Sequence, residues 1–433
     1  MMMGRYDLIH RTRRDVDRRT FLASTGLAAG AFFIPWPFVR HAAAQDAIKI
    51  GTLIPLTGAL AEFGPNFRKA ADLAATHLNE AGLSLQLVHA DDETAAIPAV
   101  AAARKLVDID KVPAIVGAAA SGVTIPVAES VTIPSKVVQI SNASTSPLIT
   151  VLPADKGQDF LFRTCPSDAL QGVVLGKLAA ELRYKKAAAM YVNNPYGQGL
   201  AEQFQKSFEK RGGKVVAMVP HDEAPAPTYV AELRRAAKEK PDVLAAISYP
   251  GHATIYLREA IEGNYIKKFL FCDGTKSLEV VKAIGEKNAE GMMGTAPGSV
   301  LTDSYNVFLA EYGKAYGEVP PLPFMTNMYD AVAVIGLAIK AAQVAGVQAI
   351  NGVAIRDHLR RVANPPGETI GAGPAVLKKA FQLLEEKKDI NYEGASGSCD
   401  FDDNGDVVTP IEVWRFTGGK ITTVRLEYDI PKV

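Results

Sequence analysis

Short β-rich runs alternate with helical segments along most of this chain, and this alternation limits the possible folds more than any other feature. Residues 48–53 form a β-rich run, and apolar residues then recur at helical spacing until Gly82. A strand, a helix and a further strand in this order predict a βαβ unit, and hence a parallel sheet with helices on both faces. The pattern continues with strands over 85–89, 114–116 and 137–140 and helices over 99–109 and 123–130.

A second βα series begins near Phe160. Its strands are expected over 187–192, 215–219, 243–247 and 269–272, each followed by a helix. After Ala296-Pro297-Gly298 the chain becomes mainly helical, with helices expected over 304–316, 326–344, 353–362 and 374–387. It ends in β-rich segments over 411–416 and 421–428. The late helices need a sheet to cover, and the first series is the one left with an open face.

A length of 433 residues suits two α/β domains. We predict an α/β fold of two doubly wound, Rossmann-like lobes joined by a three-segment hinge, with the ligand in the cleft between them. Lobe 1 is expected over residues 45–163 plus 297–400, and lobe 2 over residues 164–296 plus 401–433.

The first 44 residues have the organisation of a cleaved export segment. A basic region over 5–19 precedes an apolar stretch over 21–33 and a small-residue site at Ala42-Ala43-Ala44. Within it, Asp17-Arg18-Arg19-Thr20-Phe21-Leu22 resembles a twin-arginine signal, which predicts a periplasmic protein. The apolar stretch is short and is followed by prolines, although a retained N-terminal anchor is the alternative. No cysteine lies near the cleavage site, which argues against a lipid anchor.

Removing this leader changes the charge balance. The whole chain has 47 basic and 47 acidic residues, and residues 1–44 contain seven arginines and three aspartates, which leaves 40 basic and 44 acidic residues. A mildly acidic remainder has no surplus of cations to neutralise phosphates, so no nucleic-acid partner is expected. No later stretch has 18 uninterrupted apolar residues, so no membrane span is expected after the leader.

Motifs that carry catalysis or bind cofactors are missing from the sequence. Gly371-Ala372-Gly373 lacks the third glycine and the preceding strand of a dinucleotide loop. Neither a phosphate loop ending in Gly-Lys-Ser/Thr nor a Gly-x-Ser-x-Gly elbow occurs. The histidines are scattered, and we expect each at the surface or the edge of a cleft: His77, His89, His221, His252 and His358. We therefore predict no catalytic residue, no cofactor and no metal site.

Two further features leave alternatives open. Residues 400–406 match the opening of a calcium loop, but the twelfth position is Ile411 and Glu412 comes one place late. A tight turn between two strands is the preferred interpretation. In an oxidising compartment, Cys165, Cys272 and Cys399 allow one disulfide and leave one thiol, and the sequence does not choose among the pairings.

Two loops are unusual because they lack bulky side chains. Residues 117–122 lie between a strand and a helix, and residues 141–147 follow the strand that ends at Ile140. Small residues let a ligand approach the backbone, while hydroxyls and N–H groups at a helix start suit a carboxylate. Both loops follow the carboxyl ends of parallel strands, where open α/β sheets bind ligands. The alternative is a pair of ordinary capped βα turns.

Several segments, in order over about 46–430, resemble leucine/isoleucine/valine-type binding proteins, the solute receptors of branched-chain amino-acid ABC transporters. The matching segments are 50–58, Phe63-Gly64, 117–121, 140–147, Phe162-Arg163-Thr164, 196–199, 328–331 and 401–406. The resemblance implies the type I periplasmic-binding fold and a membrane ABC permease as partner.

The resemblance also implies positions for a ligand site. Ser121, Ala143 and Thr145 would hold a ligand carboxylate, beside the backbone of Ala119 and Ala120. Asp273 would pair with an α-ammonium, Tyr196 and Tyr249 would close over the ligand from lobe 2, and Phe63 would pack on it from lobe 1. A simple turn is the alternative for Asp273-Gly274. Phe63 lacks a hydroxyl and Ala120 replaces a family cysteine, so side-chain specificity stays open.

The sequence thus favours a monomeric binding protein that captures an amino acid, or a related small carboxylate or amide, and performs no chemistry on it. A ligand-sensing subunit of a membrane receptor is one alternative. The other is a periplasmic enzyme in which Cys165 or Cys272 pairs with a histidine, although no local motif supports it. Branched aliphatic, aromatic and small amide solutes all fit the expected pocket.

Overall fold

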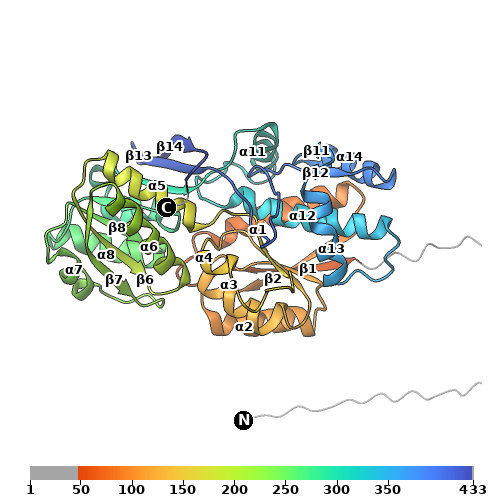
Figure 1. The fold of residues 1–433 in the computed structure, drawn as a ribbon, viewed down its shortest axis with the longest axis horizontal. Helices are drawn as coiled ribbons and strands as arrows, with labels where there is room; N and C mark the ends of the chain where they lie inside the picture. The colour runs from red at the N-terminus through yellow and green to blue at the C-terminus, as the bar shows by residue number, and fades with distance from the viewer. Residues whose placement is uncertain (1–46, 432–433) are drawn as a thin grey trace, which may run out of the picture. The chain divides into compact units, whose positions relative to one another are not determined.

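The computed structural model of the chain describes residues 47–431 (Figure 1). The export segment predicted over residues 1–44 lies outside the described residues. Two sheets built mainly of parallel strands and covered by helices make up the described part, so the predicted α/β class is confirmed. Within residues 47–431, every helix falls short of the length and apolar character that a membrane crossing requires.

The first sheet has five parallel strands in the order β2-β1-β3-β4-β5. Its strands are β1 (Ile48–Ile54), β2 (Leu85–Asp91), β3 (Ala114–Gly117), β4 (Val138–Ser141) and β5 (Leu161–Arg163). The segments between them are α1 (Gly64–Glu80), α2 (Ala96–Asp108), α3 (Ser121–Val127), the π-helical turn η1 (Ala128–Thr132) and α4 (Pro147–Thr150). Every residue of β3 and β4 is buried, as expected for central strands of a parallel sheet covered on both faces.

Late helices pack around this sheet. They are α11 (Asp303–Tyr316), α12 (Met325–Val344), α13 (Gly352–Ala363) and α14 (Pro374–Glu385). Helix α12 contacts α1, β3 and β4, α13 contacts α12 and β4, and α11 and α14 pack on α1. Figure 1 shows α12 beside α1, which comes from the opposite end of the described chain. A small parallel pair, β11 (Glu368–Ile370) with β12 (Ile390–Tyr392), was not predicted, because strands of three residues show no period.

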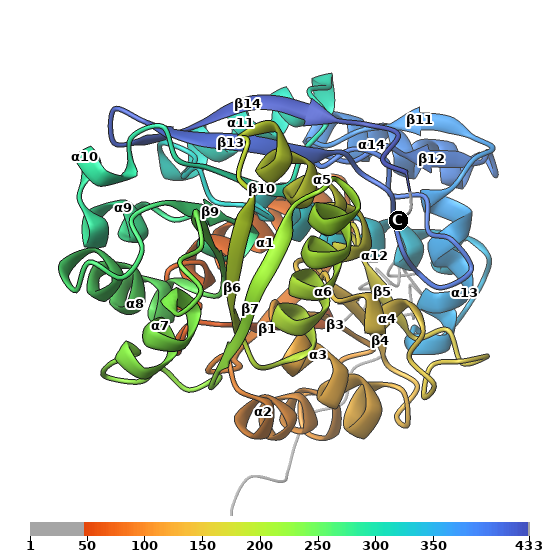
Figure 2. The same cartoon turned by 60° about the vertical axis from the view of Figure 1, so that its left-hand side comes forward.

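The second sheet has seven strands in the order β14-β13-β10-β9-β8-β6-β7. Its parallel strands are β6 (Lys186–Val192), β7 (Lys214–His221), β8 (Val243–Ile247), β9 (Phe269–Phe271) and β10 (Met293–Pro297). The hairpin of β13 (Ile411–Thr417) and β14 (Lys420–Glu427) adds to β10 in antiparallel orientation, and Figure 2 shows it along that edge of the sheet.

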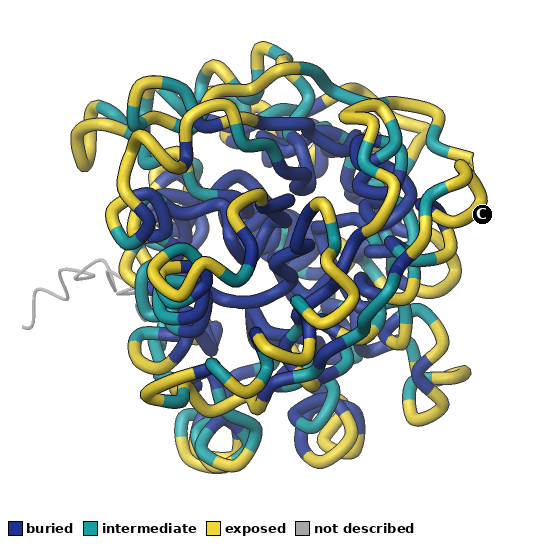
Figure 3. Tube along the Cα trace, turned by 90° about the vertical axis from the view of Figure 1, so that its left-hand side faces the viewer, coloured by how far each residue is buried: buried dark blue, intermediate teal, exposed yellow. Residues whose placement is uncertain are grey.

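The helices of the second sheet are α5 (Asp168–Glu181), α6 (Pro195–Lys210), α7 (Val230–Ala237), α8 (Pro250–Glu262), the 3-10 turn η2 (Asp273–Thr275), α9 (Leu278–Ile284) and α10 (Glu286–Ala289). Side-chain caps start α5, α6 and α9 among these helices. The Ser167 side chain accepts a hydrogen bond from Ala169 N at the start of α5, and Asn194 accepts one from Gly197 N at the start of α6. Such caps satisfy N–H groups that have no partner within the helix. Figure 3 shows the buried segments gathered inside, with exposed residues at the outer turns.

A buried ion pair ties the end of β5 to the segment that leads into β13. The Arg163 guanidinium is fully buried and donates to both carboxylate oxygens of Asp406 at 2.7 Å. Its remaining donors reach Ser144 O at 3.3 Å, Ser146 O at 3.0 Å and Thr150 Oγ1 at 2.7 Å. The guanidinium is rigid and planar, and it bonds all these oxygens at once. Arg163 therefore holds β5, the segment 144–150 and the turn at Asp406 in place relative to one another.

The strand assignments support three crossings between lobes. β5 ends in the first sheet at Arg163, β10 ends in the second at Pro297, and β13 returns the chain to the second sheet from Ile411. We propose that these crossings bound lobe 1, residues 45–163 with 297–400, and lobe 2, residues 164–296 with 401–433. A hinge of three separate segments restricts the relative motion of the lobes more than one linker does.

The calcium-like segment forms a turn, but its predicted context is wrong. Asp402 Oδ1 accepts hydrogen bonds from Asn404 N at 2.8 Å and Asp406 N at 3.0 Å. However, β12 before the turn and β13 after it belong to different sheets, so the turn joins no strand pair. The Asp406 carboxylate is engaged by Arg163. Among residues 47–431, no group of three His, Cys, Asp or Glu side chains is arranged to hold a metal ion.

The prediction that all histidines lie at the surface or the cleft edge is wrong for His77, His221 and His252, which are buried. Each bonds a hydroxyl: His77 to Tyr329 at 2.8 Å, His221 to Ser248 at 2.8 Å and His252 to Tyr229 at 2.9 Å. Burial disfavours the imidazolium, so it lowers the pKa of all three and that of His252 to about 3. A neutral imidazole with a hydroxyl partner is compatible with a core position.

The three cysteines are buried and unpaired, so the disulfide allowed by the sequence is not formed. Burial raises the pKa of each thiol, that of Cys272 to about 12. At neutral pH the thiolate, which is the reactive form, is therefore nearly absent at all three positions.

Candidate functional site

A small cavity lies between the carboxyl ends of the two sheets. It has a volume of about 20 Å³ and is lined by Leu60, Phe63, Phe67, Ala119, Ser121, Ala143, Tyr196, Tyr249, Asp273, Gly274 and Phe324. Seven of the nine predicted site residues are in that set: Phe63, Ala119, Ser121, Ala143, Tyr196, Tyr249 and Asp273. Ala120 and Thr145 are buried next to it but do not line it.

The lobe 1 wall consists of the two small-residue loops, which are held together by hydroxyls. Ser141 Oγ donates to Ala118 O at 2.6 Å and accepts from Ser144 N at 2.9 Å. Ser144 Oγ reaches Ala119 O at 3.0 Å. The hydroxyls of Ser141 and Ser144 thus hold the two loops together. Ser121, the first residue of α3, lines the cavity, and its Oγ accepts from Ser146 N at 3.2 Å.

Glycine is required where β3 ends. Gly117 has φ +123°, and a Cβ there would lie 2.0 Å from Leu53 O on the neighbouring strand. Only glycine tolerates both the backbone conformation and the close approach. This sharp turn brings the backbone of residues 118–120 to the edge of the cavity.

Asp273 supplies an acidic group on the lobe 2 side of the cavity. It follows β9 in η2, and its Oδ1 accepts from Gln171 Nε2 at 2.8 Å and from the Tyr196 hydroxyl at 2.9 Å. Burial raises the pKa of this carboxyl above its ordinary value, although both hydrogen bonds oppose the rise. A buried carboxylate of this kind is suited to a cationic partner.

A second carboxylate, Asp168, was missed by sequence reasoning. It is fully buried at the start of α5, and its Oδ2 accepts from the Thr145 hydroxyl at 2.8 Å. Burial and the nearby Asp273 raise its pKa well above the ordinary value. In sequence it looks like an ordinary acidic residue in the first turn of a helix, and only the fold brings it next to Asp273. The Thr145 hydroxyl was expected to hold a ligand, but in the structure it donates its hydrogen bond to the Asp168 carboxylate.

Aromatic rings close the cavity. The rings of Tyr196 and Tyr249 stack with centroids 5.5 Å apart and an interplanar angle of 10°. The Tyr249 hydroxyl accepts from Asn194 Nδ2 at 3.1 Å. Phe63 and Phe67 contribute rings from the start of α1, and Phe324 contributes one from the start of α12. Phe324 was also missed, because it stands in a proline-rich loop without periodic pattern.

Besides the bonds between Thr145 and Asp168, further hydrogen bonds join elements of the two lobes around the cavity. Gly251 N donates to Ala59 O at 3.1 Å, Ser146 Oγ donates to Pro195 O at 2.9 Å, and Ser277 Oγ donates to Glu62 Oε2 at 2.5 Å. Burial raises the pKa of Glu62, which the Ser277 hydroxyl opposes. With these contacts in place the lobes are closed on the cavity.

Comparison with known proteins is consistent with this architecture. Residues 47–380 match a family model described as periplasmic binding protein. A leucine-, isoleucine-, valine-, threonine- and alanine-binding protein of Pseudomonas aeruginosa is 31% identical over 311 residues, 70% of this chain and 81% of that protein. A chemotactic signal transduction system substrate-binding protein of Halobacterium salinarum is 28% identical over 393 residues, 88% of this chain and 90% of that protein.

Solved structures share the fold. A leucine-binding protein of Thermotoga maritima superposes with a TM-score of 0.74 at 24% identity, over 88% of this chain and 99% of that chain. The resemblance drawn from the sequence motifs is therefore confirmed at the level of family and fold.

Proposed function

This chain belongs to the periplasmic binding protein family, and from that premise we propose that it captures a free amino acid, or a related small carboxylate or amide, and delivers it to a membrane ABC permease. The observation that carries the proposal is the cavity shared by the two lobes, with one acidic side chain, Asp273, among aromatic rings. Closure of the lobes buries the solute, and the closed form is the one that a permease can recognise. We expect the chain to act as a monomer, because both lobes must move freely.

The polar groups of the cavity match the two ends of an amino acid. Asp273 would pair with the ammonium, which offsets the cost of burying its own charge. Ser121 and the backbone of Ala119 and Ala120 would receive the carboxylate from the opposite wall, with Ala143 and Thr145 beside them. Phe63, Tyr196 and Tyr249 would enclose the side chain of the ligand. The proposal thus includes all the ligand contacts that the family resemblance implies.

We expect the solute to leave the protein chemically unchanged. The thiols that an enzyme would use as nucleophiles are protonated, since burial raises the pKa of Cys165 and Cys272. Cys272 Sγ lies 3.0 Å from the Tyr196 hydroxyl rather than next to a base. Neither thiol is activated in the way that nucleophilic catalysis requires.

A thermal-shift screen of the full chain against L-amino acids and aromatic acids tests the proposal. At a ligand concentration 100 times Kd, we expect stabilisation by about 2.7 kcal/mol for at least one amino acid. Mass spectrometry should then recover that compound unaltered from the denatured complex. A screen in which neither an amino acid nor a related acid stabilises the chain, or recovery of a converted product, would contradict the proposal.

Sensing is a second candidate function, because one relative is named as a substrate-binding protein of a chemotactic system. The two roles share the binding step and differ in the membrane partner. Uptake of the radiolabelled solute by cells that lack this chain separates them. Lost uptake supports transport, whereas intact uptake with lost attraction to the solute supports sensing.

We also propose that residues 1–44 direct export by the twin-arginine route and are then removed, which places the remaining chain in the periplasm. Replacing both Arg18 and Arg19 with lysine should retain the uncleaved precursor in the cytoplasm, because that route requires the arginine pair. Fractionation followed by immunoblotting measures this. Arg13→Lys with Arg14→Lys is the matched control and should leave export intact; export of the Arg18/Arg19 variant would contradict the proposed route.

A further inference from the structure

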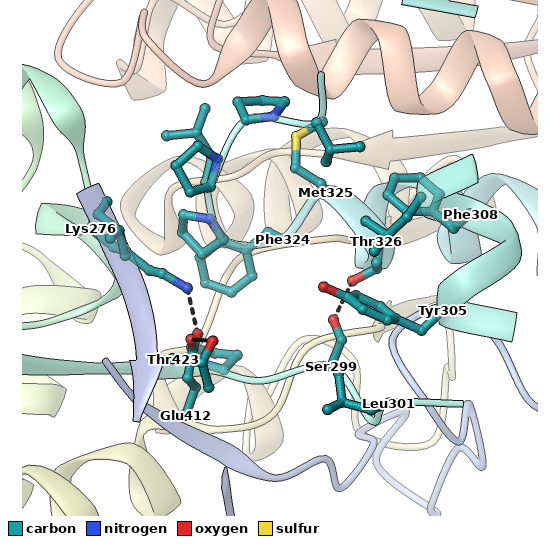
Figure 4. Close-up of a pocket in the computed structure, with 18 of the residues that line it drawn as sticks. Lys276, Ser299, Leu301, Tyr305, Phe308, Phe324, Met325, Thr326, Glu412 and Thr423 are labelled. Carbon is teal, nitrogen blue, oxygen red and sulfur yellow. Dashed lines mark hydrogen bonds and ion pairs between the residues drawn. The ribbon is translucent and has the colours of Figure 1, made fainter. Parts of the chain in front are cut away.

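A second, larger cavity lies directly behind Phe324. Its volume is about 240 Å³, compared with about 20 Å³ for the cleft cavity, and among residues 47–431 Phe324 alone lines both. Figure 4 shows Lys276, Glu412 and Thr423 on one side of it, Tyr305 and Phe308 on the other, and Phe324 between them. The cleft cavity has space for about one water molecule, so it cannot contain an amino-acid side chain unless a neighbouring ring moves.

Phe324 has the properties of a movable partition. Its backbone has φ +66°, a left-handed conformation that disfavours a bulky side chain. Three prolines precede it at 320, 321 and 323, and Met328 N donates to Phe324 O at 3.0 Å where α12 begins. The backbone is therefore fixed on both sides. A ligand would displace the ring by side-chain rotation, which joins the two cavities without moving the loop.

The far wall of the second cavity indicates the chemistry of its occupant. The Lys276 ammonium donates to a Glu412 carboxylate oxygen, and the other oxygen accepts from Thr423 Oγ1 at 2.5 Å. Lys276 and Glu412 are both largely buried. The pair offers a donor and an acceptor but no net charge, so it suits a neutral polar group better than an ion. Leu309, Leu322 and Phe308 supply apolar surface elsewhere in the cavity, which the hydroxyl-bearing residues Ser299, Tyr305 and Thr326 also line.

We propose that the cavity behind Phe324 is the side-chain subsite of the ligand. An amino-acid-type ligand held by Asp273 and Ser121 turns the Phe324 ring aside and extends an apolar stem toward Lys276 and Glu412. The ligand class is therefore an elongated amino acid whose side chain ends in a neutral group with both a hydrogen-bond donor and an acceptor, such as an amide. This inference rests on the proposed function, because it takes the head of the ligand to lie in the cleft cavity.

Calorimetric titration of the full chain with a graded set of probes tests the subsite. L-glutamine, L-citrulline and Nε-acetyl-L-lysine end in neutral donor–acceptor groups on progressively longer stems, and L-lysine has the long stem with a charged end. Affinity should rise along the neutral series, and Nε-acetyl-L-lysine should bind more tightly than L-lysine by about tenfold or more. Equal or weaker binding of Nε-acetyl-L-lysine would overturn the subsite.

Two variants test the residues through the ratio of Nε-acetyl-L-lysine affinity to L-leucine affinity. Phe324→Ala removes the partition and should raise the ratio about tenfold. Lys276→Met with Glu412→Leu removes both charges together, which avoids leaving one buried alone, and should lower the ratio about tenfold. Lys340→Met with Glu385→Leu removes an ion pair between α12 and α14 and should leave the ratio unchanged.

The outcomes separate this inference from the proposed function. If L-leucine binds but neither variant moves the ratio, the subsite is wrong and amino-acid capture stands. If no amino acid binds the unmodified chain, amino-acid capture is wrong and the subsite is rejected with it.

Discussion

Replacing Asp273 with asparagine is expected to weaken amino-acid binding by about 2–5 kcal/mol, roughly 30-fold or more in Kd. Asparagine keeps the shape of the side chain and can still accept the hydrogen bonds from Gln171 and Tyr196. What it removes is the charge that would pair with the ligand ammonium, which leaves that ammonium buried without an anion. Calorimetric titration with the amino acid that gives the largest thermal shift measures the change.

Asp108→Asn is the matched control, because it removes the same charge from an exposed position at the end of α2, outside the cavity. It should bind as the unmodified chain does. If Asp273→Asn also bound with unchanged affinity, its proposed role would be wrong.

The pH dependence of binding should follow from the same carboxyl group. Burial raises the pKa of Asp273 in the unliganded protein above 3.8, and a bound ammonium would lower it again. The ionised form binds the ligand, so affinity should be highest above the raised pKa and fall as the pH decreases through it. Asp273→Asn should lose most of this dependence. The residual dependence would report Asp168, whose pKa is raised by burial and by Asp273.

Asp406→Ala is expected to lower the free energy of unfolding by about 3–5 kcal/mol, because it leaves the fully buried Arg163 guanidinium without its anion. Arginine cannot escape this cost by losing its proton. The loss should also weaken ligand binding, since Arg163 holds the carbonyls of Ser144 and Ser146 in the ligand loop. Urea unfolding measures the stability change.

Asp403→Ala, in the same turn but exposed, provides the control and should change stability by no more than about 0.5 kcal/mol. Adding Arg163→Met to Asp406→Ala should recover part of the lost stability, because the unpaired buried charge is then gone. A single variant as stable as the unmodified chain, or a double variant less stable than the single one, would show that the pair does not have the proposed role.

The sequence predicted those features of the fold that depend on residues close together in the chain. Alternating strand and helix periods predicted both sheets, because residues a few positions apart determine which face of an element is buried. The loop after β3 could be recognised because small residues stand where a strand ends, and the structure places Ser121 on the cavity. Asp273 followed from its place after β9 together with the family resemblance.

The failures concern partners that are distant in sequence. His77 is buried because Tyr329, 252 positions away, bonds it, and no local pattern reveals that. Asp168 and Asp273 lie on different connections and meet only when α5 packs near β10. Phe324 depends on a backbone conformation that a phenylalanine rarely adopts, so propensity argues against its position.

One of the contacts that close the lobes does not involve any side chain of the cavity. The bond from Gly251 N to Ala59 O joins two backbones, and a Cβ on Gly251 would lie 2.9 Å from the Ala59 Cα. As long as Gly251 is kept, this contact is independent of the side chains that line the cavity. Those side chains can change during evolution while the backbone hydrogen bond between Gly251 and Ala59 is kept. Related proteins can therefore come to bind different solutes through changes in the cavity residues alone, while lobe closure is unchanged.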